Sequence, residues 1–168
     1  MRMLALAVLL LSSLSACAPR APADEESSSR PLSDSAFAEL QHRGHAAMGV
    51  DQYTSTHRFD DLPDGGRIEL QQDGEDAAGV ETIRQHLQHI ARAFKAGDFS
   101  DPTFVHHRQM PGTQVMRSKK DVITYTYAPL PRGGEVRITT TDSEVVRAIH
   151  AFMSAQRGEH RSGGDIHH

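Results

Sequence analysis

Apolar and polar residues alternate in two stretches of this chain, and each stretch begins beside a pair of glycines. Segment 62–70 reads Leu-Pro-Asp-Gly-Gly-Arg-Ile-Glu-Leu and recurs at 130–138 as Leu-Pro-Arg-Gly-Gly-Glu-Val-Arg-Ile. In both copies a Pro-x-Gly-Gly turn precedes residues that alternate as in a half-buried strand. Another alternating run comes before each turn, with His57 and Phe59 in the first copy and residues 123–127 in the second. Each copy therefore predicts a β-hairpin.

After each hairpin, apolar residues recur every three to four positions, which indicates an amphipathic helix. We expect the first helix to stop at Gly97. The second should begin at an N-cap, Asp142 or Ser143, and end at Gly158. The apolar stripes are Val80, Ile83, Leu87, Ile90 and Phe94 after the first hairpin, and Val145, Ile149 and Phe152 after the second.

A strand-strand-helix unit that occurs twice, at about 53–96 and 121–157, predicts an α+β fold. Two such units form a two-layer sandwich, with one four-stranded antiparallel sheet and both helices on one face. A further helix at 35–48 should precede the sheet. Residues 97–120 are too apolar for a free linker and too rich in proline and glycine for a long element, so we expect an ordered crossover loop. One domain, 36–158, accounts for the whole pattern.

The start of the chain has the features of an export signal. Residues 4–14 are apolar, follow a basic start and lead into Leu-Ser-Ala-Cys. This stretch is shorter than the about 20 residues needed to cross a hydrocarbon core. We therefore expect residues 1–16 to be a cleaved secretory signal peptide. The alternative is an N-terminal signal anchor that stays attached.

The Leu-Ser-Ala-Cys tetrapeptide resembles the lipobox of bacterial lipoproteins. The resemblance implies that Cys17 receives a diacylglyceryl group and an amide-linked acyl chain such as palmitate. Because Ala18 follows, it also implies an outer-membrane location facing the periplasm. Residues 17–35 contain no aromatic side chain, and their Pro, Ala, Ser and charged residues are typical of a flexible tether. The membrane is thus an expected partner through the lipid anchor.

Composition excludes several kinds of chemistry. Cys17 is the only cysteine, so its modification leaves no thiol for a disulfide, a zinc-thiolate site or cysteine catalysis. The formal net charge of −4 argues against nucleic-acid binding, which needs a basic face. There is no Gly-x-Ser-x-Gly elbow and no His-Glu-x-x-His motif. We therefore expect a binding protein rather than an enzyme.

Histidine and methionine are the residues whose chemistry suggests a site. The chain has 11 histidines, and imidazole suits copper, zinc, iron and nickel, whereas a thioether selects Cu(I). The sequence predicts a transition-metal site for copper, or else zinc, formed by His57, His86 and His106 with a methionine of the crossover loop. The complete set of candidate ligands is His57, His86, His89, His106, His150, Met110 and Met116.

Several of these histidines have structural alternatives. His86 lies at the border of its helix stripe, where an amphipathic packing role is common. His89 and His150 should point mostly to solvent. His57 shares strand parity with Phe59, so it is expected to face the same side, as a half-buried histidine with a hydrogen-bonded partner or as a ligand.

The methionines and the end of the chain also allow simpler explanations. Met110 and Met116 fit as anchors of the crossover loop in the core. The histidines of residues 159–168 lie in a segment that we expect to be a flexible tail, where they bind metal loosely or are merely solvated.

These residues resemble a family of small exported proteobacterial lipoproteins of uncharacterised activity, over about 48–160. Members are sometimes labelled aspartate carbamoyltransferase, but this chain lacks a Ser-Thr-Arg-Thr phosphate loop and the length for two α/β domains. The resemblance brings no catalytic residue, but it places His57, His86, His106 and His150 within family-like motifs. Those motifs are Met48-Gly49-Val50-Asp51-Gln52, Thr56-His57-x-Phe59, Gly65-Gly66, His86-Leu87-Gln88-His89-Ile90-Ala91, Ala96-Gly97-Asp98-Phe99, Phe104-Val105-His106, Pro111-Gly112, Gly133-Gly134 and Ala148-Ile149-His150-x-Phe152.

Three functions remain open from the sequence. The first is metal binding for storage, delivery or tolerance. The second is a non-catalytic module that binds an envelope protein or a small ligand with structural histidines, for which apolar residues on the open sheet face would speak. The third is a small histidine-based or metal-dependent enzyme with a water-accessible cleft.

Overall fold

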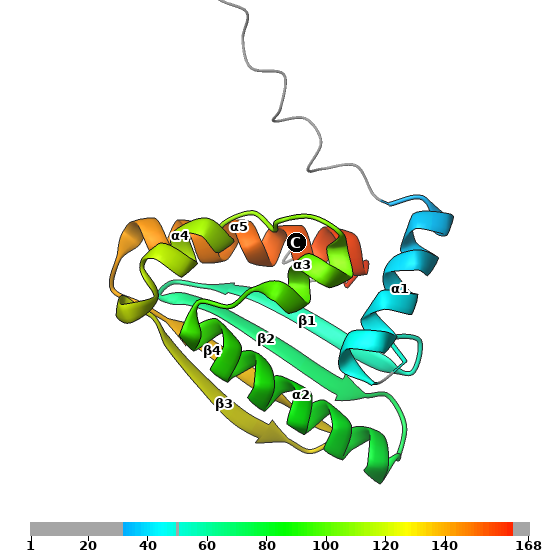
Figure 1. Cartoon of the computed structure of the whole chain (residues 1–168). Helices are drawn as coiled ribbons and strands as arrows, with labels where there is room; N and C mark the ends of the chain where they lie inside the picture. Colours follow the sequence, from blue (N-terminus) through cyan, green and yellow to red (C-terminus); the bar gives the residue numbers. More distant parts are fainter. Residues whose placement is uncertain (1–31, 50, 163–168) are drawn as a thin grey trace, which may run out of the picture.

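The computed structural model describes residues 32–49 and 51–162 of the chain. The predicted signal peptide, Cys17 and the last histidines lie outside these ranges. Four antiparallel strands form one sheet of order β1-β2-β4-β3, with helices packed on it, which confirms the predicted α+β sandwich (Figure 1). The strands are β1 Ser55–Leu62, β2 Gly65–Gln72, β3 Thr124–Leu130 and β4 Gly133–Thr139.

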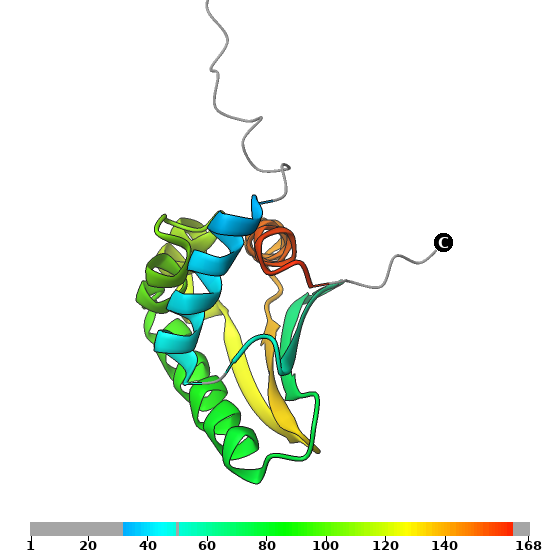
Figure 2. The same ribbon diagram turned by 90° about the vertical axis from the view of Figure 1, so that its right-hand side faces the viewer.

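Two long helices cover the sheet, as the hydrophobic stripes predict. Helix α2, Ala77–Ala96, contacts β3 and β4 of the other half, and α5, Ser143–His160, contacts β1 and β2. Asp76 and Asp142 cap their N-termini by accepting backbone N–H groups. Helix α1, Asp34–Met48, precedes the sheet (Figure 2). No helix in the described ranges is long and apolar enough to cross a membrane.

Helix α5 is longer than the sequence predicts. It continues past Gly158 to His160, so the histidine expected in a flexible tail lies in the last helical turn. A helix-interior glycine is disfavoured by only about 1 kcal/mol relative to alanine. The ring of His160 packs 5.5 Å from that of Phe59, and this contact ties the last turn to the sheet.

The two halves of the sheet are related by an approximate twofold axis. Ile68 and Val136 occupy the same position in the two copies of the repeat, and they lie directly opposite each other where β2 pairs with β4. On either side the charges are exchanged, because Arg67 and Glu69 of one copy correspond to Glu135 and Arg137 of the other. The repeat is therefore a structural duplication as well as a sequence one.

The sheet face that the helices leave open is charged. Arg67 lies 2.5 Å from Asp60 and 3.7 Å from Glu135, and Arg137 pairs with Asp64. Asp64 is an exposed turn residue and the other four are half-buried strand residues, whereas the neighbours of Arg67 and Arg137 along β2 and β4 face the helices and are buried. An apolar docking surface on the open sheet face is thus not what the fold presents.

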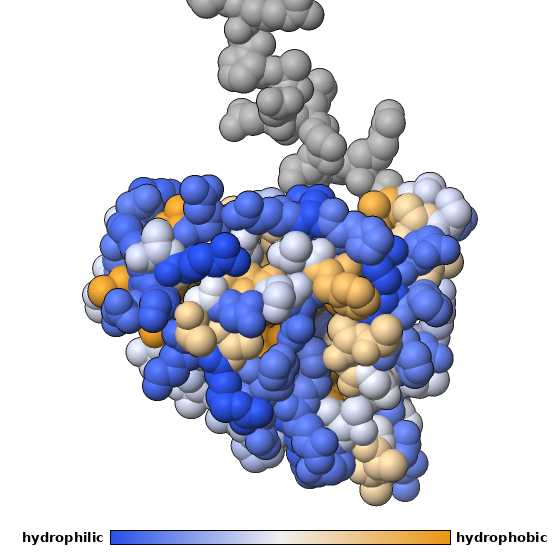
Figure 3. All heavy atoms as spheres, in the orientation of Figure 1, coloured by the Kyte–Doolittle hydropathy of each residue, from blue (hydrophilic) through white to orange (hydrophobic). Residues whose placement is uncertain are grey.

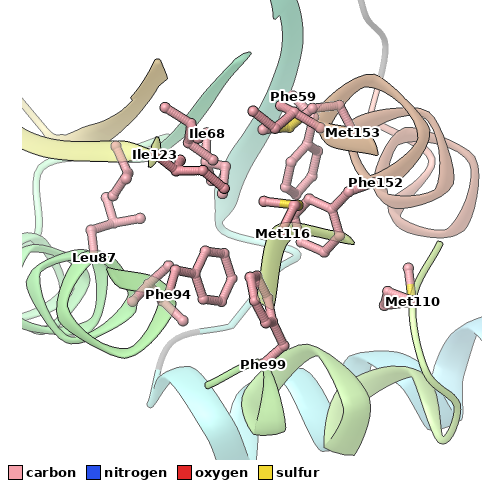
Figure 4. Packing of buried hydrophobic residues seen from close by; sticks show 14 of the residues in the cluster. Phe59, Ile68, Leu87, Phe94, Phe99, Met110, Met116, Ile123, Phe152 and Met153 are labelled. Carbon is pink, nitrogen blue, oxygen red and sulfur yellow. The ribbon is translucent and has the colours of Figure 1, made fainter. Parts of the chain in front are cut away.

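The hydrophobic core lies between the sheet and the helices. Phe94 of α2 is at its centre, 4.5 Å from Phe99, 5.9 Å from Phe152 and 6.0 Å from Tyr125 between ring centroids (Figure 4). All three phenylalanines are at most 2 % exposed. Aromatic pairs at these separations stabilise a core beyond their buried area.

The segment between the halves is ordered, as predicted, and contains short helices that the sequence pattern does not show. They are α3, Ser100–His106, α4, Thr113–Ser118, and the 3-10 helix η1, Lys120–Val122. Gly112 precedes α4 with φ of 78°, and a Cβ there would lie 1.9 Å from the carbonyl oxygen of Ala148. This close approach places the connecting segment against α5.

Candidate functional site

Four histidines from four different elements line one cavity between the helices and the sheet. They are His57 of β1, His86 of α2, His106 of α3 and His160 of α5, and we call the space the histidine cavity. Its volume is about 70 Å³, which exceeds the roughly 10–15 Å³ that one water needs. The other walls are mostly apolar and include Met48, Phe59, Ile68, Leu70, Leu87 and Ile90. Figure 3 shows the molecular face over α2 and α3, which is mainly hydrophilic with smaller apolar areas.

The structure places all three predicted principal ligands on this cavity. His57, His86 and His106 are far apart in the sequence, and the fold of β1, α2 and α3 brings them to one place. His160, which the sequence analysis assigned to the tail, lies among them. Its ring centroid is 5.1 Å from that of His57 and 5.1 Å from that of His106.

Two of the four imidazoles are held by hydrogen bonds. Nδ1 of His106 lies 2.5 Å from Oε2 of Glu159, and Nε2 lies 2.9 Å from Oε1 of Gln156. Nδ1 of His160 donates to Oε1 of Gln52 at 2.9 Å, because that oxygen can only accept. This bond leaves Nε2 of His160 with the free lone pair of the neutral ring.

The other two imidazoles have no such partner. The rings of His57 and His86 form no hydrogen bond with any residue in the described part of the chain. His57 instead stacks on Phe59, with 5.7 Å between ring centroids. Both rings are half-buried on the cavity wall, so their nitrogens are available to a ligand that enters the cavity.

Burial keeps these rings neutral. It lowers the pKa of His57 to about 3, and the neighbouring His86 lowers it further. Burial likewise lowers the pKa of His86 to about 4, against the attraction of Asp101. The pKa of His160 is well below its ordinary value, first through burial and then through His57 and His106. Near pH 7 each of these rings is uncharged and keeps one nitrogen lone pair.

The remaining histidine candidates lie elsewhere. His89 is exposed on α2, and its Nε2 is 2.8 Å from Oδ2 of Asp101. Nε2 of His150 lies 3.0 Å from the carbonyl oxygens of both Leu62 and Gly65, so it donates to the β1–β2 turn. His150 therefore has a structural contact that holds α5 to the first hairpin.

The methionines of the crossover segment are core residues. Met110 and Met116 are at most 2 % exposed and belong to the hydrophobic cluster, and neither is among the residues that line the histidine cavity. Met48, at the end of α1, is the methionine that does line it. A thioether is thus present at the site, but it comes from α1 and not from the segment that the sequence suggested.

The histidine cavity is not a preformed metal site. Residues 32–49 and 51–162 contain no group of three or more His, Cys, Asp or Glu side chains already placed to hold an ion. The ring separations are nevertheless compatible with one. Two imidazoles on the same tetrahedral ion have ring centroids roughly 5 Å apart, given metal-nitrogen bonds of about 2 Å. The rings of His57 and His160 have this separation but are stacked, with 24° between their planes, so ring rotation is needed before two nitrogens can bind one ion.

Sequence reasoning missed Gln156, Glu159 and His160, although a signal for two of them was present. Continued from Phe152 in steps of four, the stripe of α5 reaches positions 156 and 160. Treating Gly158 as the helix end concealed this continuation. The partner of His106 in Glu159 had no local signal, because 53 residues separate them.

No family model, no curated protein and no solved structure matches the sequence. The chemistry of the histidine cavity is therefore what bears on function. It offers four imidazoles, the thioether of Met48, the carboxylate of Asp101 and the amide of Gln156. Imidazole suits copper, zinc, iron and nickel, and a thioether favours Cu(I) among them.

Proposed function

We propose that the protein binds a transition-metal ion, with copper the best match and zinc the next, in the histidine cavity. The observation that carries this proposal is the convergence of four imidazoles from β1, α2, α3 and α5 on one small space. Two of these rings have no hydrogen-bond partner among the described residues. Such nitrogens can coordinate a metal ion, whereas in an apolar core an imidazole nitrogen without a partner is destabilising.

Copper is favoured by the kinds of side chain around the cavity. Met48 adds a thioether to the imidazoles, and most of the other wall residues are apolar. Thioether ligands select Cu(I) over harder ions such as magnesium or calcium. The chain has a single cysteine, Cys17, at the predicted lipid anchor, so thiolate ligation is not part of the proposal.

The proposed setting follows from the export signal. A lipid anchor at Cys17 would attach the protein to the outer membrane, facing the periplasm. There a copper-binding domain on a tether would serve metal storage, delivery or tolerance.

Metal content of the untagged protein tests the proposal. After loading with copper or zinc and removal of free ion, elemental analysis should find about one ion per chain. The double variant His57→Ala/His86→Ala should bind almost none. The matched control is His42→Ala/His45→Ala, which removes two exposed histidines of α1 and should leave the content unchanged. Wild-type protein that retains no metal after loading would refute the proposal.

A second candidate is a module that binds a small ligand with both apolar and hydrogen-bonding parts. The observation in its favour is that the walls of the histidine cavity are mostly apolar, a common feature of ligand pockets. It predicts that protein without metal releases a small organic molecule on denaturation, detectable by mass spectrometry. The charged open sheet face gives no support to an apolar partner at that surface.

A further inference from the structure

The two halves of the chain can be compared position by position, because the same landmarks occur in both. The helices start from the N-caps Asp76 and Asp142, and the inner strands start at Gly65 and Gly133. Counting from these landmarks pairs each residue of one half with its counterpart in the other. The pairing of Ile68 with Val136 across the sheet follows the same correspondence.

The comparison shows that an aromatic pair formed between a helix of one half and a strand of the other has a histidine pair as its counterpart. Phe94 is the eighteenth residue after Asp76, and His160 is the eighteenth after Asp142. Tyr125 and His57 each lie eight residues before the first glycine of the inner strand. Phe94 packs on Tyr125 with 6.0 Å between ring centroids, and His160 packs on His57 with 5.1 Å between ring centroids.

His86, a third histidine of the cavity, also has an aromatic counterpart in the other half. His86 is the tenth residue after its N-cap, and its counterpart in α5 is Phe152, a fully buried core residue. Three imidazoles on the histidine cavity thus stand where the other half has an aromatic core residue. Replacing an aromatic ring in a core with imidazole costs stability unless the nitrogens are used. His106, in the segment between the halves, has no counterpart.

Hydrogen bonding separates the same three histidines from the fourth. Both nitrogens of His106 are engaged, Nδ1 by Glu159 and Nε2 by Gln156. His57 and His86 are without hydrogen-bond partners in the described part of the chain, and His160 keeps Nε2 free. The nitrogens available to an ion are therefore those of His57, His86 and His160.

We propose that the metal ion is held by His57, His86 and His160, while His106 is a structural residue that joins α3 to α5. This inference rests on the proposed function and names its ligands. Gln52 acts as a positioning residue: by accepting the Nδ1–H of His160 it fixes the tautomer that presents Nε2. Such outer partners of metal-bound histidines commonly affect affinity 10–100-fold.

The counterpart residues in the repeat define the variants that test the ligand set. His57→Tyr and His160→Phe each restore the residue found in the other half, and His86→Phe does the same for the third position. Each variant should fold with a Tm equal to or above that of the wild type and should lose at least 90 % of the bound copper or zinc. A purely structural role for these histidines predicts the opposite, because the variants would then keep the metal.

His106→Asn is the matched comparison. It should lower Tm, since it breaks the contact with Glu159, but retain about one ion per chain with affinity within a few-fold of the wild type. If His106→Asn loses the ion while His160→Phe keeps it, the ligand set is wrong and the proposed function survives. If the wild type itself binds no copper or zinc, both fail.

Spectroscopy gives a readout that stability does not influence. In the Cu(II)-loaded protein, electron paramagnetic resonance should show nitrogen couplings that decrease by one nitrogen in His160→Phe and not in His106→Asn. Gln52→Leu should weaken copper affinity at least 10-fold and change the ¹⁵N shifts of the His160 ring in the metal-free protein. Gln52→Glu, which keeps an acceptor, should restore both. Unchanged ¹⁵N shifts in Gln52→Leu would overturn the positioning role.

Discussion

His106 and Glu159 form a buried contact that connects the segment between the two halves to the last turn of α5. Nδ1 of the imidazole lies 2.5 Å from Oε2 of the carboxylate, and the His106 side chain is 1 % exposed. Glu159 also pairs with Arg108. One carboxylate thus holds two residues of the connecting segment, so its loss should loosen that side of the histidine cavity.

Glu159→Ala is therefore expected to lower the free energy of unfolding by about 2 kcal/mol, because it leaves hydrogen-bonding groups of His106 and Arg108 unpaired. Urea unfolding measures this loss. Glu39→Ala is the control, since Glu39 is 74 % exposed and lies 3.9 Å from Arg43 in a surface pair. It should change stability by no more than about 0.5 kcal/mol. Equal effects of the two variants would contradict the role of Glu159.

The metal-free protein should lose stability in mild acid. Burial lowers the pKa of His57 to about 3 and of His86 to about 4, whereas in the unfolded chain both titrate near 6.5. Between these values the unfolded state binds more protons, so the free energy of unfolding rises with pH. This contribution is complete above about pH 6.5 and is lost as the pH falls toward 4.

Urea midpoints of the metal-free protein at pH 7.0, 5.5 and 4.5 check this dependence. The pKa of Glu159 is also below its usual value, through hydrogen bonds from His106 and Arg108 that outweigh its burial, and this adds a loss below about pH 4.5. The variant His57→Tyr/His86→Phe should have a flatter profile between pH 6.5 and 5. A profile that matches the wild type would show that other groups control acid stability.

Phe94→Ala should be among the most destabilising single changes. The ring is 2 % exposed and contacts Phe99, Phe152 and Tyr125, so its removal leaves a cavity where the two halves meet. We expect a loss of about 3–5 kcal/mol in the free energy of unfolding. Phe104→Ala, at a residue 51 % exposed, should stay within about 0.5 kcal/mol of the wild type.

Two glycines should respond to alanine in opposite directions. Gly112 has φ of 78°, and an added Cβ would lie 1.9 Å from the carbonyl oxygen of Ala148, so Gly112→Ala should cost about 2 kcal/mol or more. Gly158 lies inside α5 and a Cβ there meets nothing within 4 Å. Gly158→Ala should therefore raise the free energy of unfolding by about 0.5–1 kcal/mol. Thermal or urea unfolding of the two variants decides both signs.

The fold was predictable because its signals are local. Alternation around Gly65 and Gly133 marks the hairpins, and the stripe that ends in Phe94 marks α2. The repeat then fixes how the units combine. The short helices α3 and α4 were not predictable, since they are too short to show a period and proline and glycine surround them.

The site was predictable only in part, for a different physical reason. Strand parity placed His57 toward the core, and helix spacing placed His86 at the border of the apolar stripe of α2. Which of Met48, Met110 and Met116 reaches the histidine cavity depends on how α1 and the connecting segment pack, and no local pattern encodes that.

The pairing of Ile68 with Val136 has a consequence for how such a site arises. Two separate copies of one strand-strand-helix unit, related by the approximate twofold axis of the sheet, would build the same four-stranded sheet as a symmetric dimer. Every substitution in one subunit of such a dimer would also appear in the other. Joining the copies in a single chain removes this constraint. The contact between α2 and β3 can then keep Phe94 and Tyr125 for stability, while the equivalent contact between α5 and β1 has imidazoles at both positions. In the fused chain, one of two equivalent helix–strand contacts can therefore serve stability while the other carries the imidazoles of the histidine cavity.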